Sequence, residues 1–379
     1  MKKVMEASDA VATAVKMCGP AVIPMYPITP QTHIVEKLAS MINDAELDSE
    51  MIPVESEHSA ISAALGASAI GVRVFTATSS QGLALMHEVL FITSGMRLPV
   101  VMAVANRTLS APINIWNDQQ DSISERDSGW LQFYVESAQE AFDTVIMAYK
   151  IAEDKKVLLP AMVCLDGFTL SHVFEPVEIP EQKKIDKFLP NYKPIYKLEP
   201  KKPMSFGPIA YPDTFMGFKK MQQDAMQQSI QIIKKVHTDF KKSFGRSYGD
   251  GLVETYKTED AEYAIVAMGS VCGTIRTIID EMRKQGKKYG MIKIRAFRPF
   301  PEKELLKVSE KLKALAVLDR NTSLGNYGAL YTEMKAVCKG AIRINGFIAG
   351  LGGKDITPQD IKKMFELSEK NELSEKWIL

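Results

Sequence analysis

Short apolar runs alternate with helical patterns through the first 185 residues, and this alternation restricts the fold more than any other feature of the chain. The runs are rich in Val and Ile, and the segments between them repeat apolar residues at helical spacing. Strands of this kind, joined by helices, form a parallel sheet that is covered on both faces. The predicted strands are "AVIPMYPI", "VRVFTAT", "LPVVMAVAN" and "LLPAMVCLD", and the predicted helices are "QTHIVEKLASMI", "ESEHSAISAALGASAIG", "QGLALMHEVLFITSG" and "ESAQEAFDTVIMAYKIAED".

A second alternating unit occupies residues 257–379 and predicts a smaller α/β domain. Residues 186–256 differ from both units, because they begin with a stretch rich in Lys, Pro and Tyr that has no periodicity. A long helical run with many charges follows this stretch, and we interpret its charges as a solvated face. We therefore predict three parts: a domain over 1–185, an extended linker and helix over 186–256, and a second domain over 257–379.

Composition excludes several functional classes. The 379 residues carry a formal net charge of +1, so no excess charge favours nucleic acid or an anionic membrane as a partner. No apolar run approaches the roughly 18 residues of a membrane span, and Glu6, Asp9 and Lys16 interrupt the apolar core of a signal peptide. We expect a cytoplasmic protein. The four cysteines stand singly, which favours buried, reduced thiols and no metal site in this chain.

Polar side chains stand where the predicted strands of the first domain end. In an open α/β sheet, ligands bind outside the carboxyl ends of the strands. The threonine of "YPITP" is held there between two prolines, and the other strands end in "TSSQG", "NR" and "CLD". The candidate site residues at these ends are Thr29, Ser79, Ser80, Asn106, Arg107 and Asp166.

Each candidate also has a structural interpretation. Glu57 begins a helix of small residues, where a carboxylate also stabilises the helix dipole, and Glu55 competes for any functional role. The serines of "TSSQG" are compatible with a phosphate or polar-ring site and with a plain helix cap. Arg107 is suited to clamp a carboxylate through two hydrogen bonds, but a surface or intersubunit ion pair is equally compatible with its position.

One motif is a misleading signal. The "GDG" at 249–251 resembles the start of the diphosphate and magnesium motif of thiamine enzymes, but no Asn-Asn pair follows it. We therefore interpret these residues as a turn. The loop "APINIWNDQQDS", which contains Asp118 and Asp121, is interpreted as a site wall or a subunit contact.

Four segments together resemble the α subunit of the 2-oxoacid:ferredoxin oxidoreductases, and most closely the pyruvate branch of that family. The resemblance covers nearly the whole chain in the family's order, it is most specific over 55–130, and it is weak over 190–256. The segments are "YPITP", "ESEHSAISAALGASAIGVRVFTATSSQGLALMHEVLFITSGMRLPVVMAVANR", "SAPINIWNDQQDS" and "GLGGKDITPQDI".

The resemblance implies a thiamine-pyrimidine-binding-like parallel sheet domain followed by a smaller transketolase C-terminal-like α/β domain. It also implies a thiamine diphosphate-dependent enzyme that oxidatively decarboxylates pyruvate, passes electrons singly to ferredoxin through [4Fe–4S] clusters, and forms acetyl-CoA in a reversible reaction. Glu57 matches the glutamate that hydrogen-bonds the aminopyrimidine ring, and Ser79 and Ser80 are expected to lie beside the cofactor.

On the substrate side, Thr29 matches the threonine that contacts the keto or carboxylate oxygen of the 2-oxoacid. Arg107 matches the arginine that binds the substrate carboxylate, with Asn106 beside it. Proline residues on either side of Thr29 would hold its hydroxyl in a fixed position, which is what stabilisation of developing charge requires.

The sequence has no diphosphate and magnesium motif and no cluster cysteines. In the family these belong to a β subunit and a ferredoxin-like δ subunit, and a γ subunit completes the complex. We therefore expect Mg²⁺ and [4Fe–4S] clusters in partner subunits, and an active site shared across a subunit interface. Two alternatives stay open: action on 2-oxoisovalerate, 2-oxoglutarate or an aryl pyruvate, and a non-catalytic interaction module of the same fold.

Overall fold

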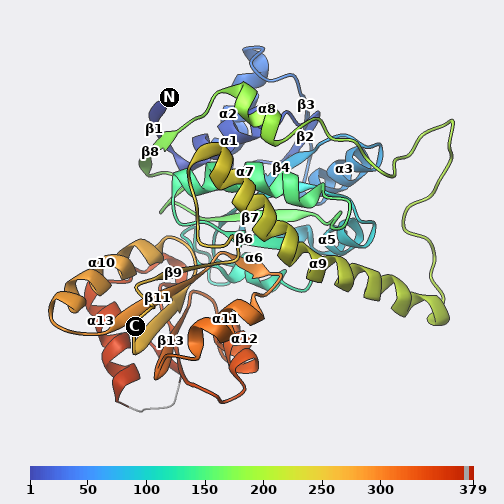
Figure 1. Cartoon of the computed structure of the whole chain (residues 1–379). Coiled ribbons are helices and arrows are strands. Elements are labelled where there is room, and N and C mark those ends of the chain that lie inside the picture. Colours follow the sequence, from blue (N-terminus) through green and yellow to red (C-terminus); the bar gives the residue numbers. More distant parts are fainter. Residues whose placement is uncertain (371–374) are drawn as a thin grey trace.

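The computed structural model describes residues 1–370 and 375–379. It contains two larger sheets with helices around them, one built mainly from the first half of the chain and one from the last third (Figure 1). The elements up to the linker are β1 Lys2–Glu6, α1 Ala7–Cys18, β2 Val22–Met25, α2 Thr32–Asn43, β3 Glu50–Pro53, α3 Glu57–Ala69, β4 Phe75–Thr78, α4 Ser80–Leu85, α5 His87–Gly95, β5 Val101–Asn106, α6 Gln120–Ser124, β6 Leu131–Tyr134, α7 Ala138–Ala152, β7 Ala161–Asp166 and β8 Phe174–Glu178.

The first sheet has the strand order β12-β6-β7-β5-β4, and a bridge from Val22 to Val74 places the β2–β3 pair beside β4. All of these pairs are parallel except β12–β6. Strands β4 to β7 are buried along their whole length, as expected for a sheet covered on both faces. The carboxyl ends of β3, β2, β4 and β5 therefore meet at one edge.

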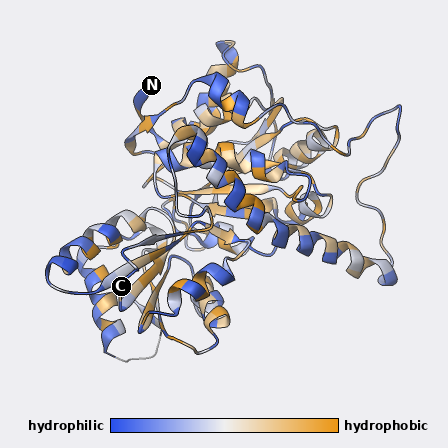
Figure 2. Cartoon of the chain, in the orientation of Figure 1, coloured by the Kyte–Doolittle hydropathy of each residue, from blue (hydrophilic) through white to orange (hydrophobic). Residues whose placement is uncertain are grey.

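The second sheet has the order β15-β14-β13-β10-β11-β9, and only the β9–β11 pair is antiparallel. Figure 2 shows hydrophobic residues concentrated in the strands at the centre of each domain. The remaining elements are α8 Gln182–Phe188, α9 Pro212–Phe244, β9 Val253–Tyr256, β10 Tyr263–Ala267, α10 Val271–Lys284, β11 Tyr289–Ile294, β12 Ala296–Arg298, α11 Glu302–Ser309, β13 Ala314–Asp319, α12 Ala329–Cys338, β14 Arg343–Ile348, the 3-10 turn η1 Leu351–Gly353, α13 Pro358–Glu369 and β15 Glu375–Trp377.

A strand crossing and an ion cluster join the domains beside β6 and α7. The chain leaves the second sheet after β11, and β12 pairs with β6 of the first sheet before the chain returns. Next to this crossing, the Glu140 carboxylate of α7 accepts hydrogen bonds from Lys293 Nζ at 2.7 Å and Arg295 Nε at 2.5 Å. Burial opposes ionisation of Glu140, but these two cations lower its pKa to about 2. The domains are thus connected by a shared sheet and by a buried ion cluster.

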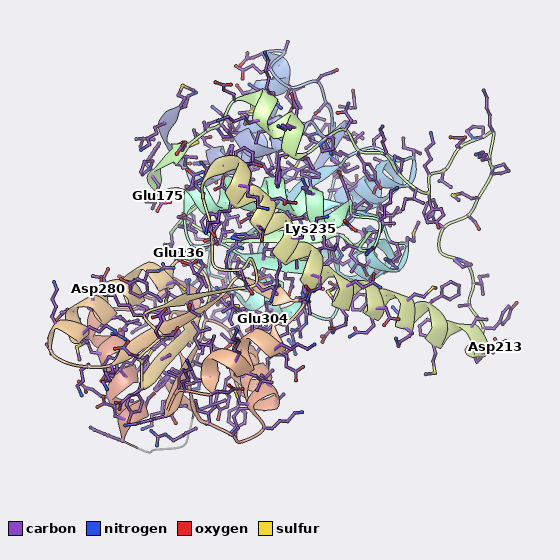
Figure 3. All side chains as sticks on the ribbon, viewed as in Figure 1. Glu136, Glu175, Asp213, Lys235, Asp280 and Glu304 are labelled. Carbon is purple, nitrogen blue, oxygen red and sulfur yellow. The ribbon has the colours of Figure 1, made fainter. Side chains whose placement is uncertain are left out.

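The linker forms an arm that projects from the body of the molecule. Residues 189–211 have no helix or strand, and the first half of α9 continues away from both sheets (Figure 1). Figure 3 places Asp213 at the far tip of this arm and Glu136 at the junction of the two domains. The arm exposes a group of large apolar side chains: Ile195, Tyr196, Leu198, Met204, Ile209, Tyr211, Phe215, Met216, Phe218 and Met221.

The α/β class predicted from the sequence is confirmed, and so is the parallel first sheet. Strand β9 lies within the range predicted for the linker and forms one edge of the second sheet. The "GDG" segment is a turn, in which Asp250 Oδ1 accepts hydrogen bonds from the N–H groups of Leu252 and Val253. Strands β3 and β6 are short, and the sequence did not predict them. Strand β12 lies within a segment predicted as a single strand running into a turn, but its separation from β11 and its pairing with β6 were not predicted.

Candidate active site

Two of the predicted site residues are in direct contact. Thr29 follows β2, Arg107 follows β5, and Arg107 Nη1 donates a hydrogen bond of 2.9 Å to the Thr29 carbonyl oxygen. The Thr29 side chain is exposed, whereas Arg107 is only 9% exposed. Gln31 fixes the Thr29 loop on the sheet, because its Nε2 donates to the Ala77 carbonyl at 2.7 Å. Thr29 and the Arg107 guanidinium thus lie side by side at the carboxyl edge, and their contact is made through the Thr29 backbone carbonyl.

The buried carboxylate of Asp121 organises this edge. It accepts hydrogen bonds from the N–H groups of Ser80 at 2.9 Å and Arg107 at 3.0 Å, and from Asn106 Nδ2 at 2.7 Å. Burial raises the pKa of Asp121 to about 7, although these bonds favour its ionised form. Asp121 therefore ties the ends of β4 and β5 together, which is a supporting role that the sequence indicated only as part of a polar loop.

Three other predicted residues are engaged within the chain. Ser79 Oγ donates to the Ala105 carbonyl at 2.6 Å, and Ser80 Oγ donates to the Thr108 carbonyl. Asn106 is fully buried, and its Nδ2 also donates to Ser122 Oγ at 2.7 Å. In this arrangement their side chains support the loops of the site, and any direct contact with cofactor or substrate stays a prediction.

Glu57 lies at the start of α3, just after β3, and its carboxylate has no hydrogen-bond partner among the described residues although it is only 6% exposed. It faces Gly82, where a Cβ atom would lie 2.5 Å from Glu57 Oε1 and 2.6 Å from Thr78 Oγ1. Thr78 Oγ1 is also buried without a partner. A buried carboxylate, an orphan hydroxyl and a glycine that leaves them room fit the polar nitrogen-bearing ring of thiamine diphosphate.

The competing carboxylate has a different environment. Glu55 is exposed and accepts a hydrogen bond from the Ser59 hydroxyl, which lowers the pKa of Glu55. Ser56, not Glu57, caps α3, because Ser56 Oγ accepts a hydrogen bond from the Ser59 N–H at 3.3 Å. The local helix start is therefore satisfied without Glu57, which leaves its carboxylate available for a ligand.

Asp166 lies at the end of β7, where the sequence placed it, but it faces the second domain. Its Oδ2 accepts hydrogen bonds from Arg320 Nη1 at 2.6 Å and from the Ser270 N–H at 2.9 Å. This carboxylate is part of the contact between the two domains. The sequence missed Thr78 and Gly82, although both stand in the "TSSQG" segment that it singled out, because the pattern does not show which way a side chain points.

Within the described residues, no group of three or more His, Cys, Asp or Glu side chains is arranged to hold a metal ion. The four cysteines are free and buried, and burial raises the pKa of Cys18, Cys164 and Cys272. No helix in the part of the chain that the structure describes is both long enough and apolar enough to cross a bilayer.

Family models cover most of the chain. Residues 13–238 match the family described as "Pyruvate flavodoxin/ferredoxin oxidoreductase, thiamine diP-bdg". Residues 261–361 match "Pyruvate:ferredoxin oxidoreductase core domain II". The chain belongs to the pyruvate:ferredoxin oxidoreductase family.

Within this family, the chain is similar to subunits of named enzymes. The chain is 54% identical to pyruvate synthase subunit PorA of Methanothermobacter thermautotrophicus, over 99% of this chain and 97% of the relative. It is 50% identical to the subunit of the same name from Pyrococcus furiosus, over 98% and 94% of the two chains. It is also 46% identical to ketoisovalerate oxidoreductase subunit VorA of Pyrococcus horikoshii, over 98% and 94%.

Solved structures confirm the fold. A 2-oxoglutarate:ferredoxin oxidoreductase from Magnetococcus marinus aligns with a TM-score of 0.75 at 18% identity, over 97% of this chain and 65% of that chain. A split gene transketolase aligns with a TM-score of 0.57 at 12% identity, over 97% and 98%. At these identities the comparisons bear on the architecture alone.

Proposed function

We propose that this chain is the α subunit of a thiamine diphosphate-dependent pyruvate:ferredoxin oxidoreductase. The complex would convert pyruvate, CoA and oxidised ferredoxin to acetyl-CoA, CO2 and reduced ferredoxin, and would run in either direction. The observation that carries the proposal is the buried, unpartnered Glu57 carboxylate beside Gly82, at the same sheet edge as the Arg107–Thr29 pair. Identity of 50–54% to pyruvate synthase subunits supports the same conclusion.

Thiamine diphosphate, when bound, supplies the carbon nucleophile and the electron sink of the reaction. Glu57 would hold the aminopyrimidine ring and exchange a proton with it, because a carboxylate in reach of a ring nitrogen can act as a general acid or base. Thr78 would add a hydroxyl next to the same ring. The loops that Ser79 and Ser80 support would then form the wall of the cofactor site.

The substrate side is formed by Arg107 and Thr29. The Arg107 guanidinium would bind the carboxylate of the 2-oxoacid. Its bond to the Thr29 carbonyl holds one side of the planar guanidinium in place. The exposed Thr29 hydroxyl would donate to the keto oxygen, which gains negative charge as the carbonyl carbon is attacked. Asn106 would support Arg107 indirectly, because Asn106 Nδ2 and the Arg107 N–H both donate hydrogen bonds to the Asp121 carboxylate.

Partners are required for a complete enzyme. Within the described residues no side chains are grouped to hold a metal ion at a diphosphate, and the exposed apolar arm over 189–221 suits contact with other subunits. We propose β, γ and δ subunits as partners, with Mg²⁺ at the diphosphate and [4Fe–4S] clusters in those chains, and ferredoxin as acceptor. The setting would be the cytoplasm, without membrane or nucleic acid.

The test is anaerobic purification of the complex followed by pyruvate- and CoA-dependent reduction of a viologen dye. Pyruvate should give the highest kcat/KM among pyruvate, 2-oxoisovalerate, 2-oxoglutarate and an aryl pyruvate. A preference for 2-oxoisovalerate would indicate instead that the chain has the substrate of its ketoisovalerate oxidoreductase relative. Purification without any iron–sulfur partner, together with no turnover of any 2-oxoacid, would favour the non-catalytic module.

A further inference from the structure

The loop that follows Arg107 supports its guanidinium. The Asn114 carbonyl accepts hydrogen bonds from Arg107 Nε at 3.2 Å and from Thr108 Oγ1 at 2.9 Å. The Thr108 N–H donates to the Trp116 carbonyl at 3.1 Å, which closes the loop on itself. The direction of the guanidinium therefore depends on where residue 114 lies.

The second domain holds this loop through the turn at 350–353. Asn114 Nδ2 donates to the Gly352 carbonyl at 3.1 Å, and the Gly353 N–H donates to the Asn117 carbonyl at 2.7 Å. Hydrogen bonds therefore run without a break from Gly352 through Asn114 and Arg107 to the Thr29 carbonyl. This relay crosses the boundary between the two domains.

Glycine is required in this turn for close approach as well as for backbone shape. Gly352 and Gly353 have φ values of +64° and +75°. A Cβ atom on Gly352 would lie 2.8 Å from Asn114 Nδ2, and one on Gly353 would lie 2.4 Å from Trp116 Cβ. No side chain fits between the turn and the loop without moving one of them.

Neighbouring strand ends of the second sheet hold the same loop. The Gln119 N–H donates to the Arg320 carbonyl at 2.8 Å, just after β13. Gln120 Oε1 accepts from the Thr322 N–H at 2.9 Å. The carboxyl edge of an α/β sheet is ordinarily where a ligand binds, but here this edge binds a loop of the other domain.

We infer that the second domain positions the substrate arginine: the glycine turn at 350–353, acting through Asn114, sets the Arg107 guanidinium beside Thr29. Asn114, Gly352 and Gly353 are positioning residues in this inference, which rests on the proposed function. A displaced guanidinium weakens the grip on the substrate carboxylate and leaves the Glu57 side of the site unchanged. Pyruvate KM should therefore respond before thiamine diphosphate affinity does.

Gly353→Ala in the intact complex tests this inference. We expect pyruvate KM to rise roughly tenfold to a hundredfold, as for other misplacements of about 1 Å, with thiamine diphosphate affinity unchanged. Gly286→Ala is the matched control, because Gly286 has a similar φ of +83° in the same domain with no atom within 4 Å of its Cβ position. An equal rise in both variants would attribute the effect to backbone strain and overturn the inference.

Two further variants guard against a folding defect. Asn114→Ala removes the bond to Gly352, together with a bond that Asn114 Oδ1 accepts from the Trp116 N–H within the loop. It keeps the carbonyl that supports Arg107 and adds no backbone strain, so it should raise pyruvate KM in the same direction by less. Trp116→Gly in the Gly353→Ala background removes the clashing Cβ and should restore part of the lost affinity. Wild-type pyruvate KM in both Gly353→Ala and Asn114→Ala would overturn the inference.

Hydrogen exchange separates this inference from the proposed function. The Thr108 amide of the intact complex should exchange faster in Gly353→Ala than in wild type, and Gly286→Ala should match wild type. This comparison needs no substrate, so it holds even if the complex turns over no 2-oxoacid, a result that would overturn the proposed function alone. Unchanged Thr108 exchange in Gly353→Ala would overturn the placement of the loop by the second domain.

Discussion

The carboxyl edges of the two sheets have similar architecture and different occupants. In the first sheet, Thr29 and Glu57 leave a hydroxyl and a carboxylate without partners among the described residues. In the second sheet, the groups at the strand ends are occupied by the first domain: Ser270 and Arg320 by Asp166, and Gly352 by Asn114. One edge is available to a ligand, whereas the other binds protein.

This difference teaches that strand order alone does not identify a site. Both sheets obey the rule that polar groups collect where parallel strands end. What distinguishes them is how far those polar groups already have partners: at the second edge Arg320 Nε is unpaired among the described residues, but Arg320 Nη1 is bonded to Asp166. A buried polar group without a partner costs the folded state about 1–3 kcal/mol. At the first edge the Thr78 hydroxyl is such a group within the described part of the chain, and a ligand bound beside Glu57 would supply the missing bond.

The largest expected effect comes from a substitution in the buried ion cluster that attaches the second domain to the first. Glu140→Gln should destabilise the chain by about 3–5 kcal/mol, because it leaves Lys293 and Arg295 buried with less compensation. Thermal or chemical denaturation measures the loss. Glu262→Gln, at an exposed pair with Lys313, is the control and should change stability little.

The pKa of Glu140 adds a pH test to this comparison. Because the folded-state pKa of about 2 lies below the value of about 4.3 in an unfolded chain, Glu140 stabilises the fold above the unfolded pKa. That contribution should be lost as pH falls from about 4 towards about 2. Equal stability of wild type and Glu140→Gln at pH 7 would contradict this account.

The next effect concerns the available carboxylate. Glu57→Gln keeps the size of the side chain and removes its ability to accept a proton, so turnover in the complex should fall at least ~100-fold. Viologen reduction with saturating pyruvate and CoA measures it. Glu55→Gln is the control, because Glu55 is exposed and already bonded to Ser59, and its turnover should stay near wild type. Similar losses in both variants would remove Glu57 from the site.

The two substrate anchors should fail in different ways. Arg107→Lys keeps the positive charge and loses the planar guanidinium that can donate two parallel hydrogen bonds to a carboxylate. Pyruvate KM should therefore rise roughly tenfold or more. Thr29→Val keeps the shape and loses the donor, so it should lower kcat more than it raises KM. Steady-state kinetics at saturating CoA separate the two. If neither variant changes the pyruvate kinetics, the residues are not anchors.

The smallest effect is the pH response of Asp121. Burial raises its pKa to about 7, and its ionised form accepts the bonds that place Arg107. Pyruvate kcat/KM should therefore fall a few-fold as pH drops below about 7. The sign for stability is opposite: the folded pKa exceeds the value of about 3.9 in an unfolded chain, so this group's contribution to stability falls as pH rises from about 4 to about 7.

The control for this response is Asp121→Asn, which cannot ionise. The variant should show no step in pyruvate kcat/KM near pH 7, because the asparagine side chain does not titrate. Its kcat/KM should be low at every pH, because the side-chain NH2 group of the asparagine would face the N–H groups of Ser80 and Arg107. A step of the same size in wild type and Asp121→Asn would assign the titration to another group.

The sequence predicted the parts of this molecule that depend on local pattern. The proximity of Thr29 and Arg107 followed from the rule that parallel strands end at one edge, although 78 positions separate the bonded residues. Thr78 and Gly82 were missed because their roles depend on side-chain direction. The pairing of Glu140 with Lys293, 153 positions apart, depends on how two finished domains meet, and no periodicity carries that information.

The short strand β12 has a consequence for how the chain folds while it is being synthesised. Strand β6 ends at Tyr134, but its partner on the outer side, β12, ends only at Arg298. At ~5–20 residues per second, a ribosome would need on the order of ten to thirty seconds to synthesise the intervening segment. Through that interval the nascent first domain has an unpaired edge, which is a template for pairing with other chains. Three residues from the last third of the sequence thus complete the domain that was made first.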